Sequence, residues 1–151
     1  MTDGAGDRPL DVLLINPGGR DRIYQDLGEA LSAVEPPLWC RLIAGYCLDR
    51  GLTVEIMDSE ALDLHPGAVA ERVARARPRL VVMVVFGHQP SASTQQMAPA
   101  GETCRAIKAV SELPILIVGG HVSALPERTL AEEAVDFVCK GEGPVTVVGL
   151  A

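Results

Sequence analysis

Five short apolar runs, spread along the whole chain, constrain the fold more than any other feature of the sequence. Their apolar character is continuous instead of alternating, which is typical of strands buried on both faces of a parallel sheet. Helical patterns separate them, and right-handed crossovers between parallel strands put helices on both faces. The sequence therefore predicts a doubly wound α/β sandwich with a five-stranded parallel sheet. Its strands are expected at residues 10–15, 53–57, 80–85, 115–118 and 136–139, and its helices at 38–50, 66–77, 99–110 and 126–134.

The size and charge of the chain limit its class. At 151 residues and 48% hydrophobic, the chain can bury one ordinary core. The formal net charge of −7, without a cluster of Lys or Arg, argues against a nucleic-acid partner. No apolar run approaches the roughly 20 residues of a membrane span, and the polar first nine residues do not resemble a signal peptide. We therefore expect a cytoplasmic protein without a membrane partner, with a disordered N-terminus at 1–9 and one domain at 10–151.

The four cysteines, at positions 40, 47, 104 and 139, form neither a CxxC pair nor the CxxxCxxC triplet of an iron–sulfur site. Thiolate ligation of a metal is therefore not expected in this chain. Cys40 and Cys47 lie one heptad apart on a predicted helix, and we interpret them as small buried hydrophobic residues.

The stretch FGHQPSASTQQM, residues 86–97, follows the third strand and is predicted to be a long polar loop. Ordered loops of this length are often functional. Segments 16–19, 119–123 and 140–143 follow other strands, so all four should meet at the carboxyl edge of the sheet, where doubly wound folds bind ligands. Glycine there lets the backbone approach a ligand closely. The sequence predicts a broad, flat ligand that is held mostly by main chain.

The first of these segments does not fit the familiar nucleotide folds. It lacks the GxGxxG turn of dinucleotide-binding proteins, and no P-loop Lys-Ser/Thr is present. Asn16 stands where a phospho-receiver would need Asp, and the hydroxyl residues typical of flavin mononucleotide sites are missing. Asp58 ends the second strand as a ribose-binding acid would, but we interpret it as a turn cap.

Four stretches, LLINPGG, EPPLWCRLIAGYCLDRGLTVEIMD, ILIVGGHVSALPERTL and VDFVCKGEG, together resemble the N-terminal cobalamin (vitamin B12)-binding domain of cobalamin-dependent radical S-adenosylmethionine (SAM) enzymes. The resemblance covers about residues 11–143. It implies a Rossmann-like, flavodoxin-like topology with strand order 2-1-3-4-5. It also implies that the corrin lies across the carboxyl edge, with the nucleotide tail of the cofactor in a slot beside the sheet.

The same resemblance implies which residues hold the cofactor. Polar side chains after the third strand are expected to hydrogen-bond the corrin amides, and His121 is expected to border the nucleotide tail. Trp39 is left open between the core and a wall of the cofactor site. The implied corrinoid-binding residues are Asn16, Pro17, Gly18, Gly19, Pro36, Leu38, Gly87, His88, Gln89, Pro90, Ser91, Ser93, Thr94, Gly119, Gly120, His121, Gly141 and Glu142.

A protein ligand to cobalt is not expected. The DxHxxG motif that supplies a lower histidine in some cobalamin domains is absent after the first strand, and His65 in the stretch DLHPG is interpreted as a helix cap. The resemblance implies a base-off cofactor without a protein histidine on the metal. Axial ligation is one lever by which proteins tune a metal's potential. His88 is the one weak candidate for a ligand or close neighbour of cobalt.

The resembled enzymes pass a methyl group from SAM through methylcobalamin to a substrate, or carry out other radical chemistry. Their SAM and [4Fe-4S] sites lie in a C-terminal radical SAM barrel, so we interpret the chain as a fragment that binds cobalamin and has no catalytic residues of its own. The sequence leaves two alternatives open. One is a flavodoxin-like nucleotide- or flavin-binding enzyme, and the other is a stand-alone cobalamin sensor or interaction domain.

Overall fold

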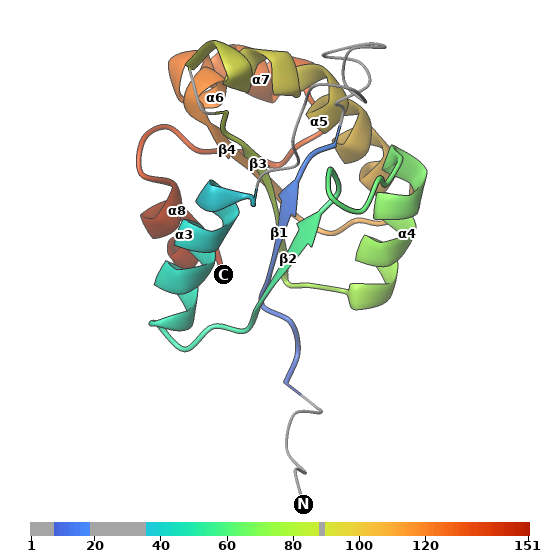
Figure 1. Ribbon diagram of the computed structural model, residues 1–151, viewed down its shortest axis with the longest axis vertical. Coiled ribbons are helices and arrows are strands. Elements are labelled where there is room, and N and C mark those ends of the chain that lie inside the picture. The colour runs from blue at the N-terminus through green and yellow to red at the C-terminus, as the bar shows by residue number, and fades with distance from the viewer. Residues whose placement is uncertain (1–7, 19–35, 88–89) are drawn as a thin grey trace, which may run out of the picture.

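The computed structural model describes residues 8–18, 36–87 and 90–151, and of residues 90 and 91 it describes the backbone alone. Its five strands are β1 (Val12–Asn16), β2 (Val54–Asp58), β3 (Leu80–Val85), β4 (Ile115–Gly119) and β5 (Phe137–Val138). They pair in the order β2-β1-β3-β4-β5, and every pairing is parallel (Figure 1). The predicted Rossmann-like sheet with its flavodoxin-like strand order is confirmed.

Helices cover both faces of the sheet, as the continuous apolar runs predict. One face carries α3 (Leu38–Leu48) and α8 (Gly143–Leu150), and the other carries α4 (Pro66–Ala76) and α5 (Pro90–Val110) (Figure 1). Neighbouring residues of a strand point to opposite faces. Leu14 of β1 therefore packs with the buried side of α3, whereas Leu13 packs with α4 and α5. The central strands β3 and β4 are buried along their whole length.

Helix α5 begins much earlier than the sequence indicates, so the predicted loop at 86–97 is wrong from residue 90 onward. The sequence pattern misleads because polar residues cover the exposed side of the first turns, and Pro99 lies inside the helix. A proline in a helix interior costs about 3 kcal/mol. Burial of one side of the helix against the sheet outweighs this cost. Buried positions along the helix include Ser93, Met97, Ala100, Cys104 and Ile107.

Two helices have no counterpart among the predicted elements. α6 (Gly120–Ala124) is a single short turn that follows β4 directly and buries Val122. α8 carries apolar residues around its whole circumference, including β-branched valines, so it shows no helical stripe. By contrast, α7 (Pro126–Glu132) was predicted, with Glu127 in its first turn.

Of the helix boundaries that the sequence marks most clearly, the start of α4 is confirmed. His65 caps α4: its Nδ1 accepts a hydrogen bond from the backbone N–H of Ala68 at 3.2 Å. The helix predicted at 38–50 ends two residues earlier, at Leu48, and Gly51 lies in the turn that follows with φ +80°, a conformation that glycine adopts without strain. All four cysteines are buried and free, including Cys40 and Cys47 on α3. Within the described ranges, no helix is both long enough and apolar enough to pass through a membrane.

Candidate functional site

The exits of β1 and β2 are tied together at the carboxyl edge of the sheet. Asn16 donates from Nδ2 to Asp58 Oδ1 at 2.9 Å, and the same carboxylate oxygen accepts from the backbone N–H of Ala61 at 3.2 Å. The backbone N–H of Ser59 donates to the carbonyl of Asn16 at 3.0 Å. Asp58 therefore caps the turn after β2, as interpreted from the sequence, and Asn16 is positioned by that turn.

Beside this exit lies a buried hydroxyl without a protein partner. Ser59 is 2% exposed, and its Oγ finds no hydrogen-bond partner among the described residues. Gly18 lies against it, because a Cβ at Gly18 would be 3.3 Å from the Ser59 carbonyl oxygen. Buried polar groups are nearly always hydrogen-bonded. The Ser59 hydroxyl is therefore an exception at this edge: a buried polar group without a partner among the described residues.

Ser93 joins three elements at the exits of β3 and β4. Its hydroxyl donates to the carbonyl oxygen of Val85, at the end of β3, and accepts from the backbone N–H of His121 in α6 at 3.0 Å. Gly119 ends β4 where a Cβ would lie 2.3 Å from the Val85 carbonyl oxygen, so only glycine fits. At the neighbouring Gly120 a Cβ would meet nothing closer than 3.8 Å. Ser93 thus holds the end of β3 and the start of α6 together, and Gly120 leaves the backbone open beside them.

Thr94 and His121 form a polar pair on the same side of the sheet. Thr94 Oγ1 lies 3.0 Å from His121 Nδ1, and Thr94 is exposed while His121 is half-buried. The pair presents a hydroxyl and an imidazole next to the open backbone of Gly120. Such groups can donate to or accept from the amides of a ligand.

The exit of β5 is linked to this corner through Ser123 of α6. Its Oγ donates to the Cys139 carbonyl at 3.3 Å and accepts from the Gly141 N–H at 3.3 Å. Gly141 has φ +102°, which favours glycine. Glu142 precedes α8 and is exposed. The chain thus forms one rim from β1 to the start of α8.

Of the remaining residues expected at the site, some are described by the structure and some are not. Pro17 and Gly87 lie at the ends of β1 and β3, and Pro36 and Leu38 lie at the start of α3. A Cβ at Gly87 would lie 2.2 Å from the Ala92 Cβ, so glycine allows the close approach of this residue to α5. Outside the described residues lie Gly19, His88, Gln89 and the side chains of Pro90 and Ser91.

Trp39, which the sequence leaves open between core and cofactor wall, is not a core residue. It is 42% exposed, and its ring stacks on Phe86 with the centroids 4.4 Å apart and an interplanar angle of 23°. Phe86 directly follows β3, so the stacked pair stands at the rim.

Residues 24–151 match the family model of the B12 binding domain. The chain belongs to the B12-binding domain family. The resemblance found in the sequence is thereby confirmed, and cobalamin is confirmed as the cofactor at the level of the family.

The B12-binding domain is also similar to parts of longer proteins. It is 32% identical over an aligned length of 147 residues to an anaerobic magnesium-protoporphyrin IX monomethyl ester cyclase from Synechocystis sp., and the match covers 93% of this chain and 27% of the cyclase. Two structures of the radical SAM methyltransferase TsrM from Kitasatospora setae match with TM-scores of 0.57 and 0.55, at 20% and 17% identity. One holds tryptophan and a SAM analogue, the other cobalamin and a [4Fe-4S] cluster. They cover 78% and 79% of the domain, which spans 20% of each, and they show a shared fold.

Two of the buried thiols are not suited to nucleophilic chemistry. Burial raises the pKa of Cys40 to about 12, and burial raises the pKa of Cys104 to the same value. A thiol with so high a pKa is not a nucleophile near neutral pH. The described part of the chain also holds no group of three or more His, Cys, Asp or Glu that could bind a metal ion.

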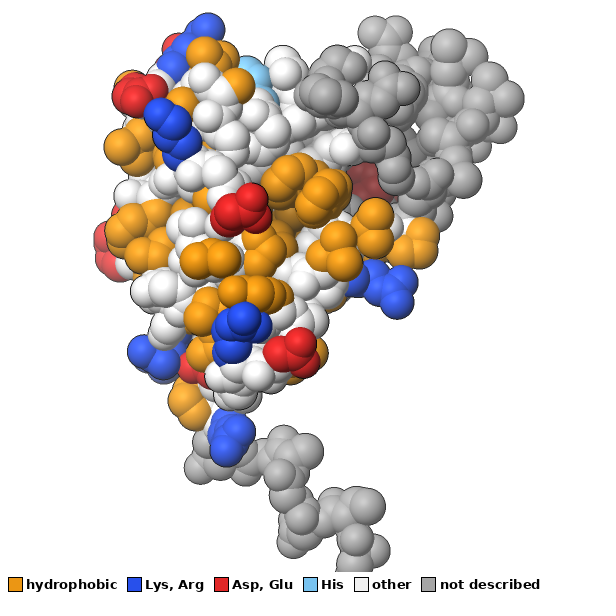
Figure 2. Space-filling view, turned by 90° about the vertical axis from the view of Figure 1, so that its left-hand side faces the viewer, with side chains coloured by type: hydrophobic (Ala, Val, Ile, Leu, Met, Phe, Trp, Pro, Cys, Tyr) orange, Lys and Arg blue, Asp and Glu red, His pale blue; other side chains and the backbone are white. Residues whose placement is uncertain are grey.

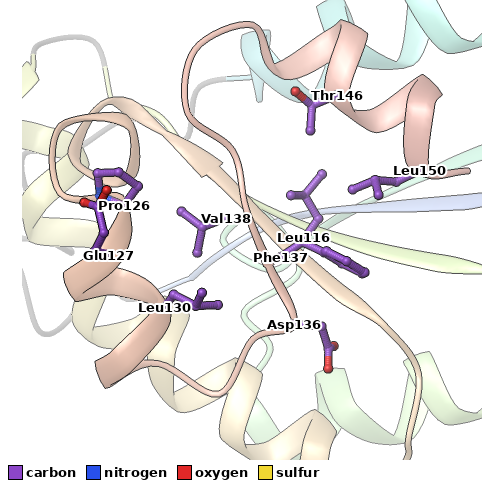
Figure 3. A pocket seen from close by; sticks show the side chains of 9 residues that line it. All are labelled: Leu116, Pro126, Glu127, Leu130, Asp136, Phe137, Val138, Thr146 and Leu150. Atoms are coloured by element: carbon purple, nitrogen blue, oxygen red, sulfur yellow. The ribbon is translucent and has the colours of Figure 1, made fainter.

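A separate apolar groove of about 420 Å³ lies along the outer edge of the sheet, between α7, β5 and α8 (Figure 3). Side chains such as Leu130, Phe137 and Leu150 line it. None of the corrinoid-binding residues expected from the sequence lines this groove. It is therefore distinct from the rim.

Two parts of the site were not predicted from the sequence: the exit of β2 and the pairing of Trp39 with Phe86. The signal for the first was present, because parallel strands all end at the same edge, and Asp58 and Ser59 follow the second apolar run. The stacked pair joins residues 47 positions apart, which no local pattern reveals.

Proposed function

We propose that the domain binds cobalamin across its rim and is the cobalamin-binding module of a longer radical SAM enzyme of the methyltransferase type. Membership of the B12-binding family carries the proposal, together with a glycine-bearing rim at the carboxyl edge. A cytoplasmic location, expected from the polar N-terminus, is part of the proposal.

Two features of the rim support cofactor binding. Gly120 and Gly141 leave open backbone along the edge, which suits close approach of a broad macrocycle. The pair of Thr94 and His121 would supply polar atoms for the amides around a corrin. Bound cobalamin would supply a cobalt centre that can accept and donate a methyl group.

A spectroscopic experiment tests binding. The protein is mixed with hydroxocobalamin and desalted, and the visible spectrum of the protein fraction is recorded. We expect corrin absorbance to stay with the protein. Gly120→Leu should abolish retention because its side chain fills open space on the rim, whereas Gly149→Leu, at an open position on α8, should retain the cofactor. Passage of all corrin into the small-molecule fraction with the unmodified protein contradicts the proposal.

We propose further that the cofactor is bound base-off, without a protein histidine on cobalt. The exit of β1 carries Asn16, Pro17 and Gly18 instead of a histidine motif, and the Nδ1 atoms of His65 and His121 are engaged by Ala68 and Thr94. The retained corrin should therefore show a base-off spectrum that is unchanged in His88→Ala and in His121→Ala. A shifted band in either variant identifies a histidine on the metal and overturns this part.

A radical SAM domain is the proposed partner within the same longer protein. The domain spans only 27% and 20% of the length of the relatives above, so a homologous protein has room for the SAM and [4Fe-4S] sites elsewhere. The coding sequence downstream of the Ala151 codon is expected to contain the CxxxCxxC motif of a [4Fe-4S] site. Its absence from a longer reading frame would remove this partner.

The cyclase relative favours a second candidate, radical ring formation without methyl transfer. The two differ in the fate of the SAM methyl group. The longer protein, loaded with cobalamin and reduced, is incubated with SAM that carries a labelled methyl group. Label in the corrin fraction supports methyl transfer, and 5′-deoxyadenosine without any labelled corrin supports the cyclase type.

A further inference from the structure

Two of the few aromatic residues of the chain are stacked at the rim. The chain holds one Trp, two Phe and two Tyr in 151 residues, so a stack of Trp39 on Phe86 uses a large share of them. Trp39 is the second residue of α3, and Phe86 directly follows β3. One face of the indole rests on Phe86, and the side chain is still 42% exposed. The stacked indole therefore keeps a substantial exposed surface at the rim.

The pair belongs to one side of the sheet. Leu80, Val82 and Val84 of β3 point toward α3 and α8, and Phe86 continues this alternation and packs against the same cluster. Leu38 and Leu42 on α3 are also more than half exposed. Figure 2 shows that hydrophobic side chains gather on this face of the molecule. The polar pair of Thr94 and His121, by contrast, comes from α5 and α6, on the opposite side, which favours the corrin amides over the nucleotide tail as the partner of His121.

The rim is therefore divided into a polar half and an aromatic half. The amide fringe of a corrin needs hydrogen-bond donors and acceptors, which the stacked pair lacks apart from the indole N–H. A neutral, flat aromatic group suits the partly exposed indole of Trp39 instead, because stacked aromatic rings gain energy beyond their buried area. Cobalamin carries one such group, the dimethylbenzimidazole base of its nucleotide tail.

We propose that Trp39, supported by Phe86, forms a stacking platform for the base of the nucleotide tail, and that this platform makes the domain select corrinoids that carry a flat aromatic base. This inference rests on the proposed function. It goes further, because it separates recognition of the base from recognition of the corrin ring and gives the first to two named residues.

The test compares cobalamin with cobinamide, which has the same corrin ring and no base. Dissociation constants are measured by equilibrium dialysis for the unmodified protein and for Trp39→Leu, Trp39→Phe and Phe86→Leu. We expect Trp39→Leu to weaken cobalamin binding about tenfold, the scale of one lost aromatic stack. Trp39→Phe should restore part of the affinity. Cobinamide binding should stay within about twofold in all variants, since that ligand makes no contact with the platform.

Phe137→Leu is the matched control, because Phe137 is a half-exposed aromatic residue at β5 that lines the separate groove. It should leave both dissociation constants unchanged. Equal weakening of cobalamin and cobinamide by Trp39→Leu, or no weakening of either, overturns the inference. If Trp39→Leu fails to fold, Phe86→Leu and Trp39→Phe carry the comparison. A failure of the proposed function looks different, because the unmodified protein would then retain neither corrinoid.

Discussion

At the scale of single residues, the rim depends on positions where an added side-chain atom would clash or a lost one would leave a group unpaired. Gly119 is the clearest, since the carbonyl of Val85 occupies the space that a side chain would need. Both residues belong to central parallel strands that are fully buried. A shift of either strand would disturb packing on both faces, because interiors are as densely packed as organic crystals.

Gly119→Ala should therefore destabilise the protein by about 1–3 kcal/mol, the usual range for an overpacked core. Urea unfolding followed by circular dichroism measures the change. Gly45→Ala is the control: Gly45 is exposed on α3 with open space around its Cβ position, so alanine should stabilise the helix by up to about 1 kcal/mol. Equal stabilities for the two variants would contradict the account of Gly119.

Asp11 gives a prediction about pH. Its carboxylate accepts hydrogen bonds from the backbone N–H of Thr53 at 2.9 Å and from Arg79 at 3.1 Å, and the first of these is the main reason why its pKa lies below 3.8. A carboxyl whose pKa is lowered by folding stabilises the protein above its ordinary pKa, and this contribution is lost as the pH falls through the folded value.

Asp11→Asn should accordingly lower the free energy of unfolding by about 1 kcal/mol at neutral pH, because a hydrogen bond to a charged group becomes one to a neutral amide. The difference from the unmodified protein should shrink as the pH falls below about 4. Urea titrations at several pH values measure it. A difference that stays constant down to about pH 3 would show that the carboxylate charge is irrelevant.

At the scale of elements, the sequence predicted what strong local signals encode. Continuous apolar runs indicated all five strands, and His65 before Pro66 marked the start of α4. The first turns of α5 were missed because their contacts are not local: Ser93 and Met97 are buried only because β3 and β4 lie beneath them. α8 was not predicted because its apolar residues cover all sides of the helix, and only its contacts with the sheet and α3 determine which side is buried.

Ser93 is expected to act as a clamp between α5, β3 and α6. Ser93→Ala removes a donor to the Val85 carbonyl and an acceptor for the His121 N–H, and the unpaired groups should cost about 1–3 kcal/mol. Ser111→Ala is the control, since Ser111 bonds only the Ile107 carbonyl within the same chain segment, at 3.2 Å. Thermal unfolding compares the two. A loss that is no larger for Ser93→Ala than for Ser111→Ala would show that the clamp is unimportant.

At the scale of the whole molecule, the position of the site could be predicted and its construction could not. Parallel strands bring all their exits to one edge whatever their side chains, so the rim followed from the fold class alone. The contacts of Asn16 with Asp58 and of Trp39 with Phe86 required strand order and register, because each joins distant parts of the chain.

The buried thiols give a prediction that concerns the entire fold. All four cysteines are buried, and the pKa of about 12 for Cys40 and Cys104 leaves almost no thiolate at about pH 8. In native buffer a thiol reagent such as DTNB should therefore react no faster than the molecule unfolds. Labelling in increasing urea should follow the unfolding curve. Rapid labelling of one or more cysteines without urea would show that a thiol is accessible in the folded state.

The position of Trp39 gives the molecule an optical reporter of its own. It is the only indole in the chain, so ultraviolet emission excited selectively from tryptophan comes from the stacked ring at the rim and from no other place. Corrinoids absorb in the wavelength region where indoles emit, so a corrinoid bound at the rim would quench that emission by energy transfer. Arrival and departure of the cofactor can thus be timed in a stopped-flow instrument without attaching a dye.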